Sequence, residues 1–592
     1  MTAIVQELQT NPDRAIIREF QTSDGAQLRF RHWPAARPRA GGIVMLHRGH
    51  EHGGRLGHLT DELDWSAYDV FALDLRGHGL STQSQTPNRT VARLARDLEE
   101  FAQHLATEDA LARTDFFLVA QSLSAVVATT WIHDYAPVLR GCTLAAPAFK
   151  LDLGLPIVGP LLKAAQNMVG SFRVPSFVGP SMITADKARI ESNQRDPMIT
   201  RHIETDLLLD MGETGKRLVT DAWAITTPIQ MLIAGRDCVA DARAANRFFH
   251  GLGSETTELH EYPKLRHDLL GEADRKPVLD DLNRFIIQCF AKPATAPDLT
   301  HADKAGPARE EADRLLKPLS PLNPARAYWG ATKLGLKLAA PLSKGIAVGR
   351  ETGFDSGSAL DYVYRNQATG FGTLGRAIDR QYLDAVGWQG IRQRKPHVEI
   401  LAARALDQLR QAGKPRHLVD LAAGHGRYVL EMPWEALAQT ESIRLRDFSP
   451  INVAAGRELI VQKSLDDKAR FDQGDAFDAE AIAALNPAPT VVIVSGLYEL
   501  FDDNDLIRQS LSGIARAVPV GGYLVYTNQP WHPQLEMIAR CLTSHREGQL
   551  WVMRRRSQME MDQLVTQAGF EKQDQLIDRW GIFSVSLAKR VA

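Results

Sequence analysis

The chain has few cysteines for its length. Its 592 residues include 4 cysteines, which lie far apart, and no two of them form a C-x-x-C pair. Disulfide frameworks and structural zinc sites need paired or clustered cysteines, so the sequence predicts neither. No metal site is expected, and a reducing cytoplasm is the expected compartment.

The chain also lacks an excess of basic charge and any long apolar run. Lys and Arg number 69 against 71 Asp and Glu, which argues against nucleic acid as a partner. The first residues, MTAIVQELQTNPDRAII, show no basic segment followed by an apolar one, and no stretch reaches the ~18 apolar residues of a spanning helix. We expect a soluble cytoplasmic protein, or one resting on the inner membrane surface.

Short apolar runs alternate with helix-length segments in both halves of the chain. Such runs of four to six residues are typical of buried parallel strands. The expected strands are 42–46, 70–74, 116–119 and 229–234 in the first half, and 417–421, 443–446, 490–495 and 523–527 in the second. The sequence therefore predicts an α/β protein with two separate sheets.

Two segments interrupt this alternation. Residues 151–227 begin with apolar sequence punctuated by Pro and Gly and continue as helical sequence, which predicts a helical lid inserted in the first sheet. Residues 291–325 are rich in Pro, Ala and charge, as interdomain linkers are. The expected domains are 1–290 and 326–592, the second beginning with a helical cap over about 326–413.

A serine stands where the third expected strand runs into a helix. Ser122 lies between the small residues Ala120 and Ser124, at positions where the sharp turn of a hydrolase nucleophile usually has glycines. Asp237 follows the fourth expected strand, and His267 comes 30 residues later. The order Ser, Asp, His is that of α/β-hydrolases, in which an imidazole activates the serine and a carboxylate orients the imidazole.

Six short motifs in residues 14–290 carry a family resemblance. They are HRGHEHGGR, DLRGHGLS, AQSLS, RDPM, AGRDCVAD and RHDLL. In this order they resemble the monoacylglycerol lipase and lysophospholipase branch of the α/β-hydrolases. The resemblance implies an α/β-hydrolase sheet with a lid, and a substrate that is a carboxylic ester of a lipid-like molecule.

The resemblance also implies roles for single residues. Ser122 would be the nucleophile, His267 the general base and Asp237 its orienting acid. The N–H groups of Leu123 and Gly49 would form the oxyanion hole, and Arg48 stands where the family usually has a glycine. Asp241 remains an alternative for the acid.

Three histidines of one loop need separate mention. His47, His50 and His52 resemble a metal cluster, but their spacing and the lack of a carboxylate partner argue against a zinc site. A hydrolase fold that has kept its shape without activity also remains open, because the turn around Ser122 departs from the usual glycines.

A glycine turn with an acid ahead of it follows the first expected strand of the second half. The segment HLVDLAAGHGRY contains Asp420, Gly424 and Gly426. A phosphate cradle would avoid a carboxylate there, and Val429 replaces the third glycine of the dinucleotide pattern. An acid before such a turn favours a cationic, sugar-bearing ligand.

Residues of about 355–592 resemble the class I S-adenosylmethionine-dependent methyltransferases. The resemblance implies a Rossmann-like sheet that ends in an antiparallel strand pair, and S-adenosyl-L-methionine as the cofactor. Carried over by position, the cofactor-binding residues are Asp420, Ala422, Gly424, Gly426, Asp447, Asp475, Ala476 and Ser495. Asp447 would accept hydrogen bonds from the ribose hydroxyls, and Ala422 replaces the first glycine of the usual loop.

The methyl acceptor is less defined by the sequence. No Asn-Pro-Pro-aromatic run follows the fourth strand of the second half, so methylation of nucleobase amino groups gains no support. His532, after the fifth strand, is either a base at the acceptor or a structural loop histidine. Residues 382–394 are expected to cap the acceptor site, with Trp388 packing there.

The segment 315–350 carries six basic residues and no acidic one. It is either a basic helix on an anionic membrane or a linker followed by a packed basic helix. We therefore expect a bifunctional enzyme, a serine ester hydrolase joined to a methyltransferase with a small-molecule or lipid acceptor. The alternative is a regulatory or scaffold protein in which one or both halves bind ligand without turnover.

Overall fold

The computed structural model describes residues 15–82, 89–151, 158–546 and 548–592. The chain forms two compact units that divide between Pro297 and Asp298. Part of the expected lid, 152–157, lies outside the described residues. Within the described ranges, no helix combines the length and the apolarity that crossing a bilayer requires.

The first unit is built on an eight-stranded sheet. Its strands are β1 (Ile16–Gln21), β2 (Gln27–Trp33), β3 (Gly41–Leu46), β4 (Tyr68–Leu73), β5 (Phe116–Gln121), β6 (Gly141–Ala145), β9 (Ile229–Ala234) and β10 (Thr257–Tyr262). The strand order is β1-β2-β4-β3-β5-β6-β9-β10. β2 is antiparallel to both of its neighbours, and every other neighbouring pair is parallel.

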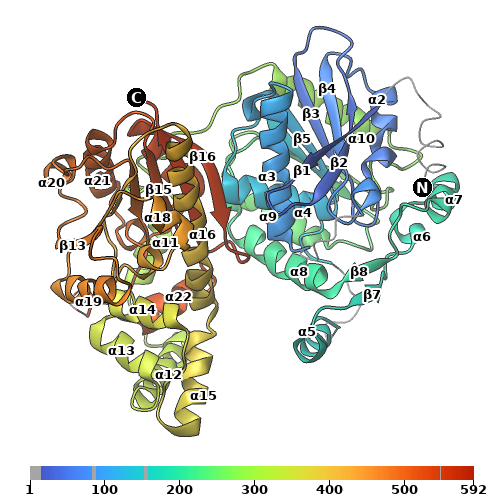
Figure 1. Cartoon of the computed structure of the whole chain (residues 1–592). Coiled ribbons are helices and arrows are strands. Elements are labelled where there is room, and N and C mark those ends of the chain that lie inside the picture. The colour runs from blue at the N-terminus through green and yellow to red at the C-terminus, as the bar shows by residue number, and fades with distance from the viewer. Residues whose placement is uncertain (1–14, 83–88, 152–157, 547) are drawn as a thin grey trace. The chain divides into compact units, whose positions relative to one another are not determined.

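Helices cover both faces of this sheet (Figure 1). They are α2 (His58–Glu62), α3 (Val91–Glu108), α4 (Leu123–Tyr135), α9 (Ala242–Gly251) and α10 (Lys276–Phe290). Successive residues of a strand point to opposite faces. Val70 of β4 accordingly packs in the core that α10 covers, while the next residue, Phe71, meets Phe101 of α3 at 6.4 Å between ring centroids.

The lid lies between β6 and β9. Its described elements are α5 (Val158–Val169), β7 (Arg173–Pro175), α6 (Pro180–Ile183), α7 (Lys187–Arg195), β8 (His202–Glu204) and α8 (Thr205–Thr220). β7 and β8 form a small antiparallel sheet of their own. The insertion therefore has the helical character that the sequence predicts, with one short hairpin added.

The second unit has a seven-stranded sheet. Its strands are β11 (His417–Asp420), β12 (Ser442–Asp447), β13 (Ala469–Gln473), β14 (Val491–Val494), β15 (Tyr523–Asn528), β16 (Phe570–Ile577) and β17 (Ser584–Arg590). The order is β13-β12-β11-β14-β15-β17-β16, with β11 to β15 parallel and β17 antiparallel to both neighbours. The strand order reverses between β11 and β14, which is where open α/β sheets bind ligands.

Most of this unit's helices precede or separate those strands. They are α11 (Pro307–Leu316), α12 (Pro324–Ala339), α13 (Lys344–Thr352), α14 (Gly357–Arg365), α15 (Gly372–Leu383), α16 (Val386–Gln411), α17 (Arg427–Leu430), α18 (Trp434–Gln439), α19 (Pro450–Gln462), α20 (Ala479–Ala483), α21 (Asn504–Ala517), α22 (Leu535–Cys541) and α23 (Gln558–Gln567). Helices α12 to α16 occupy the region in which the sequence predicts a cap.

The segment 291–325, expected to be a linker, is folded against the second unit from Leu299 onward. The Leu299 N–H donates to Gln563 at 2.8 Å, and Asp303 accepts from the Asn504 N–H at 3.0 Å, so both belong to the second unit. α11 buries Ala308, Ala312 and Leu315. These positions are four and three residues apart, which places them on one face of a helix, and the many charges around them hide that pattern.

Candidate active sites

Ser122 sits on a sharp turn between β5 and α4. Its backbone has a φ of 58° and a ψ of −116°, a left-handed conformation that side chains other than glycine rarely adopt. The flanking Ala120 and Ser124 are fully buried, so the turn has room only for small side chains there. The turn points the serine away from the strand, which exposes its hydroxyl to partners from other loops.

The structure brings Ser122, His267 and Asp237 together. The Ser122 Oγ lies 2.7 Å from His267 Nε2, and the His267 Nδ1 lies 2.7 Å from Asp237 Oδ2. Asp237 Oδ1 accepts from two backbone N–H groups at 2.8 and 3.0 Å. Burial alone would raise the pKa of the Asp237 carboxyl, but the hydrogen bonds from His267 and from the backbone hold it below its ordinary value.

Asp241 is engaged elsewhere. It accepts a hydrogen bond from the Arg243 N–H at the start of α9, and it pairs with Lys150 at 2.8 Å. Its carboxylate therefore caps a helix and neutralises a lysine, whereas the Asp237 carboxylate hydrogen-bonds the His267 Nδ1. The geometry favours Asp237 over Asp241 as the partner of the imidazole.

Gly49 lies against the turn that carries Ser122. A Cβ built on Gly49 would be 3.6 Å from the Cβ of Leu123, so the two backbones are neighbours. The Ser124 hydroxyl donates to the carbonyl of His47 and ties this loop to the turn. A glycine at position 124 could not make this bond.

Arg48 does not obstruct the turn. Its guanidinium is buried, with Nη2 2.5 Å from Glu51 and Nε 3.7 Å from Asp268. Asp268 also accepts from Gln121 at 3.1 Å and from Arg189 at 3.1 Å. The arginine that replaces the usual glycine therefore joins a buried ion network beside His267.

The three histidines of the loop have separate partners. His47 accepts from the Leu75 N–H at 3.1 Å, His50 lies 2.9 Å from the Ser176 hydroxyl, and His52 lies 2.9 Å from Asp196 of the lid. Burial lowers the pKa of His47 and of His50 to about 3, so both rings are neutral at neutral pH. In the described part of the chain, no cluster of three His, Cys, Asp or Glu residues is arranged to hold a metal ion.

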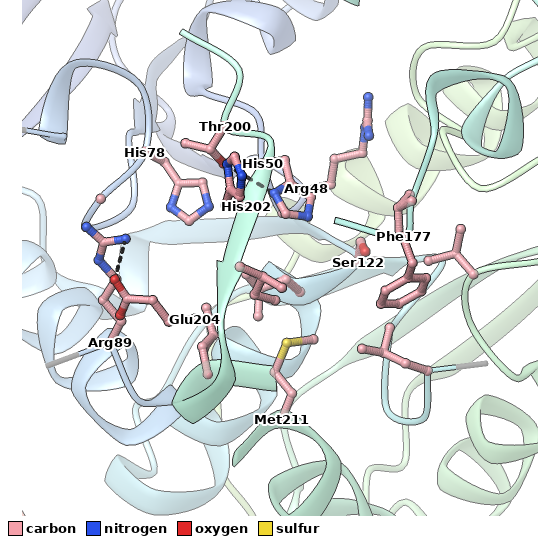
Figure 2. Close-up of a pocket in the computed structure, with 18 of the residues that line it drawn as sticks. Arg48, His50, His78, Arg89, Ser122, Phe177, Thr200, His202, Glu204 and Met211 are labelled. Carbon is pink, nitrogen blue, oxygen red and sulfur yellow. Dashed lines mark hydrogen bonds and ion pairs between the residues drawn. The ribbon is translucent and has the colours of Figure 1, made fainter. Parts of the chain in front are cut away.

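A cavity of about 70 Å³ opens beside Ser122 (Figure 2). Phe177 and Met211 line it with apolar surface. On another side, Arg89 and Glu204 form an ion pair at 3.2 Å. A cavity of this volume holds only a small chemical group. The lid supplies most of the apolar side of its wall, including Phe177 and Met211.

The glycine turn of the second unit is bound to the end of the next strand. Gly424 and Gly426 have φ angles of 55° and 73°, which glycine adopts without strain. The Gly424 N–H donates to Asp447 Oδ2 at 2.8 Å, while Asp447 Oδ1 accepts from Ser449 and Asn452. Asp420, at the end of β11, is fully buried, and burial raises the pKa of its carboxyl to about 7.

The other expected cofactor residues lie at the ends of neighbouring strands. Asp475 accepts from the Phe477 N–H at 2.8 Å in the turn after β13, where Ala476 is buried. Ala422 lies in the glycine turn, with its N–H 3.4 Å from Asp420. Ser495 follows β14, and its buried hydroxyl has no hydrogen-bond partner among the described residues. A buried hydroxyl left open where the strand order reverses fits a polar ligand held between β11 and β14.

A second cavity, of about 650 Å³, lies in the second unit. Trp388 and Arg394 of α16 line it, together with Glu499 after β14 and His532 after β15. The expected cap segment 382–394 includes Arg394, but the sequence assigns no role to Arg394 or to Glu499. Arg394 gives no signal because α16 carries several arginines, whereas Glu499 stands four residues after Ser495, close to a strand end that the sequence does predict.

His532 is buried in this wall. Its Nδ1 accepts from the Gln534 N–H at 3.0 Å, so the proton of the neutral ring is on Nε2. Burial lowers the pKa of the ring to about 3. A ring in this state donates a hydrogen bond from Nε2, which argues against His532 as the base at the acceptor.

Two family models match the chain. Residues 282–590 match the family described as "Putative methyltransferase", and residues 37–274 match the family described as "Serine aminopeptidase, S33".

Similar proteins cover the whole chain or its first half. "Uncharacterized protein YnbC" of Escherichia coli (strain K12) is 46% identical over 575 residues, which are 96% of this chain and 98% of that protein. "Phospholipase YtpA" of Bacillus subtilis (strain 168) is 25% identical over 260 residues, 43% of this chain and 98% of that protein. "Monoacylglycerol lipase" of Mycolicibacterium smegmatis is 24% identical over 286 residues, 45% of this chain and 95% of that protein.

These matches agree with the two units of the fold. The first unit has the sheet, the lid and the turn of an α/β-hydrolase, and the second has the sheet order and glycine turn of a methyltransferase. Since the methyltransferase model takes in more than half of the residues, the chain belongs to that family, with an α/β-hydrolase joined to its N-terminal side.

Proposed function

We propose that the chain is a bifunctional enzyme, a serine ester hydrolase joined to an S-adenosyl-L-methionine-dependent methyltransferase. The observation that carries the first half is the hydrogen-bonded series Ser122, His267 and Asp237. In this series His267 takes the proton of the Ser122 hydroxyl as the oxygen attacks an ester carbonyl. Asp237 orients the ring and stabilises its charged form.

The N–H groups of Leu123 and Gly49 are proposed to stabilise the oxyanion that forms in this attack. Their backbones lie side by side at the turn, and Ser124 fixes the loop between them. Loss of one such donor typically costs about 10²–10³ in rate. The lid, and the phospholipase and lipase names of two relatives, support a lipid-like ester as the substrate.

The hydrolase is tested with p-nitrophenyl acyl esters. Ser122→Ala is expected to abolish turnover and labelling by a fluorophosphonate probe. Asp237→Asn is expected to lower kcat by about 10⁴, because the imidazole is left in the wrong tautomer. Asp241→Asn is the matched control, since Asp241 pairs with Lys150, and it should retain the wild-type rate.

Three results would contradict the hydrolase proposal. Undiminished turnover by Ser122→Ala would remove the assigned nucleophile. Hydrolysis of amino-acid p-nitroanilides in preference to the esters would make the unit an aminopeptidase. A wild-type chain that the probe does not label and that turns over neither substrate would favour a regulatory or scaffold role.

The methyltransferase half is proposed to bind S-adenosyl-L-methionine at the ends of β11, β12 and β14. Asp447 would hold the ribose hydroxyls, the turn of Gly424 and Gly426 would allow close approach, and Ser495 would face the reacting end. When bound, the cofactor supplies an electrophilic methyl group, and the chain's task is to hold the acceptor in line with it.

Calorimetry of the intact chain tests this half. We expect micromolar affinity for S-adenosyl-L-methionine, weakened at least tenfold by Asp447→Ala, because about 1.4 kcal/mol or more of hydrogen bonding to the ribose is lost. Asp472→Ala is the control, because Asp472 lies on the adjoining strand and pairs with Arg444 at 2.6 Å. The absence of any binding heat in the wild type would defeat the proposal.

A further inference from the structure

The 650 Å³ cavity of the second unit is apolar along most of its wall. Trp388, Trp551 and Phe583 line it, together with aliphatic side chains from α12, α13 and α22. Its volume lies within the roughly 300–1,000 Å³ of small-molecule sites. The cavity therefore suits a ligand that is mostly apolar and that can pack against aromatic rings. α12, α16 and α22 can be followed in Figure 1.

One polar group on this wall is a buried carboxylate with a free oxygen. Glu499 follows β14 and is 7% exposed. Its Oε1 accepts from the Thr527 hydroxyl at 2.6 Å. Its Oε2 has no hydrogen-bond partner in the part of the chain that the structure describes. A buried oxygen in this state lacks a hydrogen-bond donor, which a ligand can provide.

Two donors line the same cavity. Arg394 has Nη1 3.8 Å from Glu499 and Nη2 3.3 Å from the Tyr364 hydroxyl, while its buried Nε has no partner among the described residues. His532 presents an Nε2–H, as its tautomer requires. The wall therefore offers one acceptor, Glu499, with the Arg394 donor beside it, and a second donor, His532, next to Gly387 of α16.

We propose that the cavity takes an apolar molecule with an acidic hydroxyl group, a phenol or an enol, and that Glu499 accepts the proton of that hydroxyl during methyl transfer. A hydroxyl donates one hydrogen bond and accepts others, so it satisfies Glu499 together with the neighbouring Arg394. A carboxylate would leave Glu499 without a donor and would repel it. An ammonium would leave the two donors without an acceptor.

This inference rests on the proposed methyltransferase function, and its chemistry balances. The hydroxyl proton passes to Glu499 Oε2, and the oxygen uses a lone pair to form the new O–CH₃ bond. The bond between the methyl carbon and sulfur breaks, and its electron pair stays on sulfur. The products are a methyl ether, S-adenosylhomocysteine and a protonated Glu499 that later loses its proton to water.

The first test needs no cofactor and no variant. Tryptophan fluorescence follows the binding of 4-heptylphenol, octanoate and octylamine to the intact chain, since Trp388 and Trp551 line the cavity. The phenol is expected to bind at least tenfold more tightly than either charged ligand. Tighter binding of octanoate or octylamine, or equal binding of all three, would overturn the proposal.

The second test isolates Glu499. A 4-nitrophenol with an alkyl tail reports its own ionisation by absorbance, and we compare its apparent pKa when bound to the wild type and to Glu499→Gln. Removing the carboxylate beside Arg394 is expected to lower that pKa by one unit or more, because the phenolate then meets only donors. Glu480→Gln is the control, since Glu480 is exposed and pairs with Arg516.

The outcomes separate the inference from the proposed function. An unchanged pKa in a folded Glu499→Gln overturns the role of Glu499. If Glu499→Gln does not fold, the relative affinities of the wild type for the three ligands decide whether the proposal stands. Calorimetry with S-adenosyl-L-methionine alone tests the cofactor site, so a chain that binds the phenol and not the cofactor defeats the proposed function without altering the ligand class.

Discussion

Asp420 is a carboxylate that the fold keeps away from water. It ends β11, is fully buried, and has a pKa raised to about 7 by that burial and by the nearby Asp447 carboxylate. An ordinary Asp in the unfolded chain has a pKa near 3.9. Between about pH 4 and pH 7, Asp420 is therefore protonated in the folded protein and ionised in the unfolded chain.

The sign of the resulting pH dependence follows from this difference. The cost of the buried charge is absent below about pH 4 and is fully present above about pH 7, so this residue lowers stability as the pH rises. Asp420→Asn is expected to stabilise the cofactor-free chain more at pH 8 than at pH 5, by roughly 3 kcal/mol. Urea unfolding of the second unit at both pH values measures it, and an equal gain at both would contradict it.

Two departures from the hydrolase pattern are explained by contacts that no motif records. Ser124 replaces a glycine and bonds the His47 carbonyl, and Arg48 replaces a glycine and pairs with Glu51 and Asp268. The sequence predicts which residues surround Ser122, because they follow strand ends in order. It does not show that the replacements support one another, because their partners lie on loops far apart in the chain.

At the scale of elements, α12 differs from its neighbours in having no buried residue. Arg326, Lys333 and Lys337 recur at helical spacing and are exposed. Beside them runs a second stripe that includes Leu334 and Leu338, which are 56% and 68% exposed. A basic stripe beside an exposed apolar one is typical of helices that lie on anionic membranes.

We propose that α12 makes the peripheral membrane contact that the sequence leaves open. Reversing Arg326, Lys333 and Lys337 to Glu is expected to weaken flotation with phosphatidylglycerol vesicles by about 100-fold or more, at roughly 1 kcal/mol for each basic residue. The matched control reverses Lys216, Lys276 and Arg284, which are exposed and paired with carboxylates. Equal flotation of both triple variants, or none by the wild type, would contradict the contact.

At the scale of the whole molecule, the sequence predicts most of the buried parallel strands. The expected strands 116–119 and 229–234 correspond to β5 and β9, and those at 417–421 and 523–527 to β11 and β15. Strands β2 and β6, which lie inside the first sheet, are not predicted, and neither are the edge strands β1, β10 and β13. In the three edge strands, charged and polar residues replace the apolar run. β6 is buried along its whole length, and its sequence, GCTLA, carries only one large apolar residue.

The division of the chain is less well predicted than its strands. A segment rich in Pro and charge has the composition of a linker, yet residues from Leu299 onward bond to the second unit. Composition averages over a segment, whereas docking depends on three apolar residues on one face of α11, Ala308, Ala312 and Leu315. The sequence singles out one wall residue of the large cavity, Trp388 of the expected cap segment 382–394. It does not predict the rest of the wall, which gathers residues from α12 to β15 and beyond.

The hydrogen bonds between the lid and the loop after β3 have a consequence for how an ester would enter. His50 reaches Ser176, and His52 reaches Asp196, from the same short loop that carries Gly49. Under the proposed hydrolase function, an acyl chain large enough to displace the lid would break these hydrogen bonds and so free the loop beside Ser122. Entry of such a substrate and alignment of the Gly49 N–H, the proposed oxyanion donor, would then be coupled, whereas short esters that leave the lid in place would bypass that coupling.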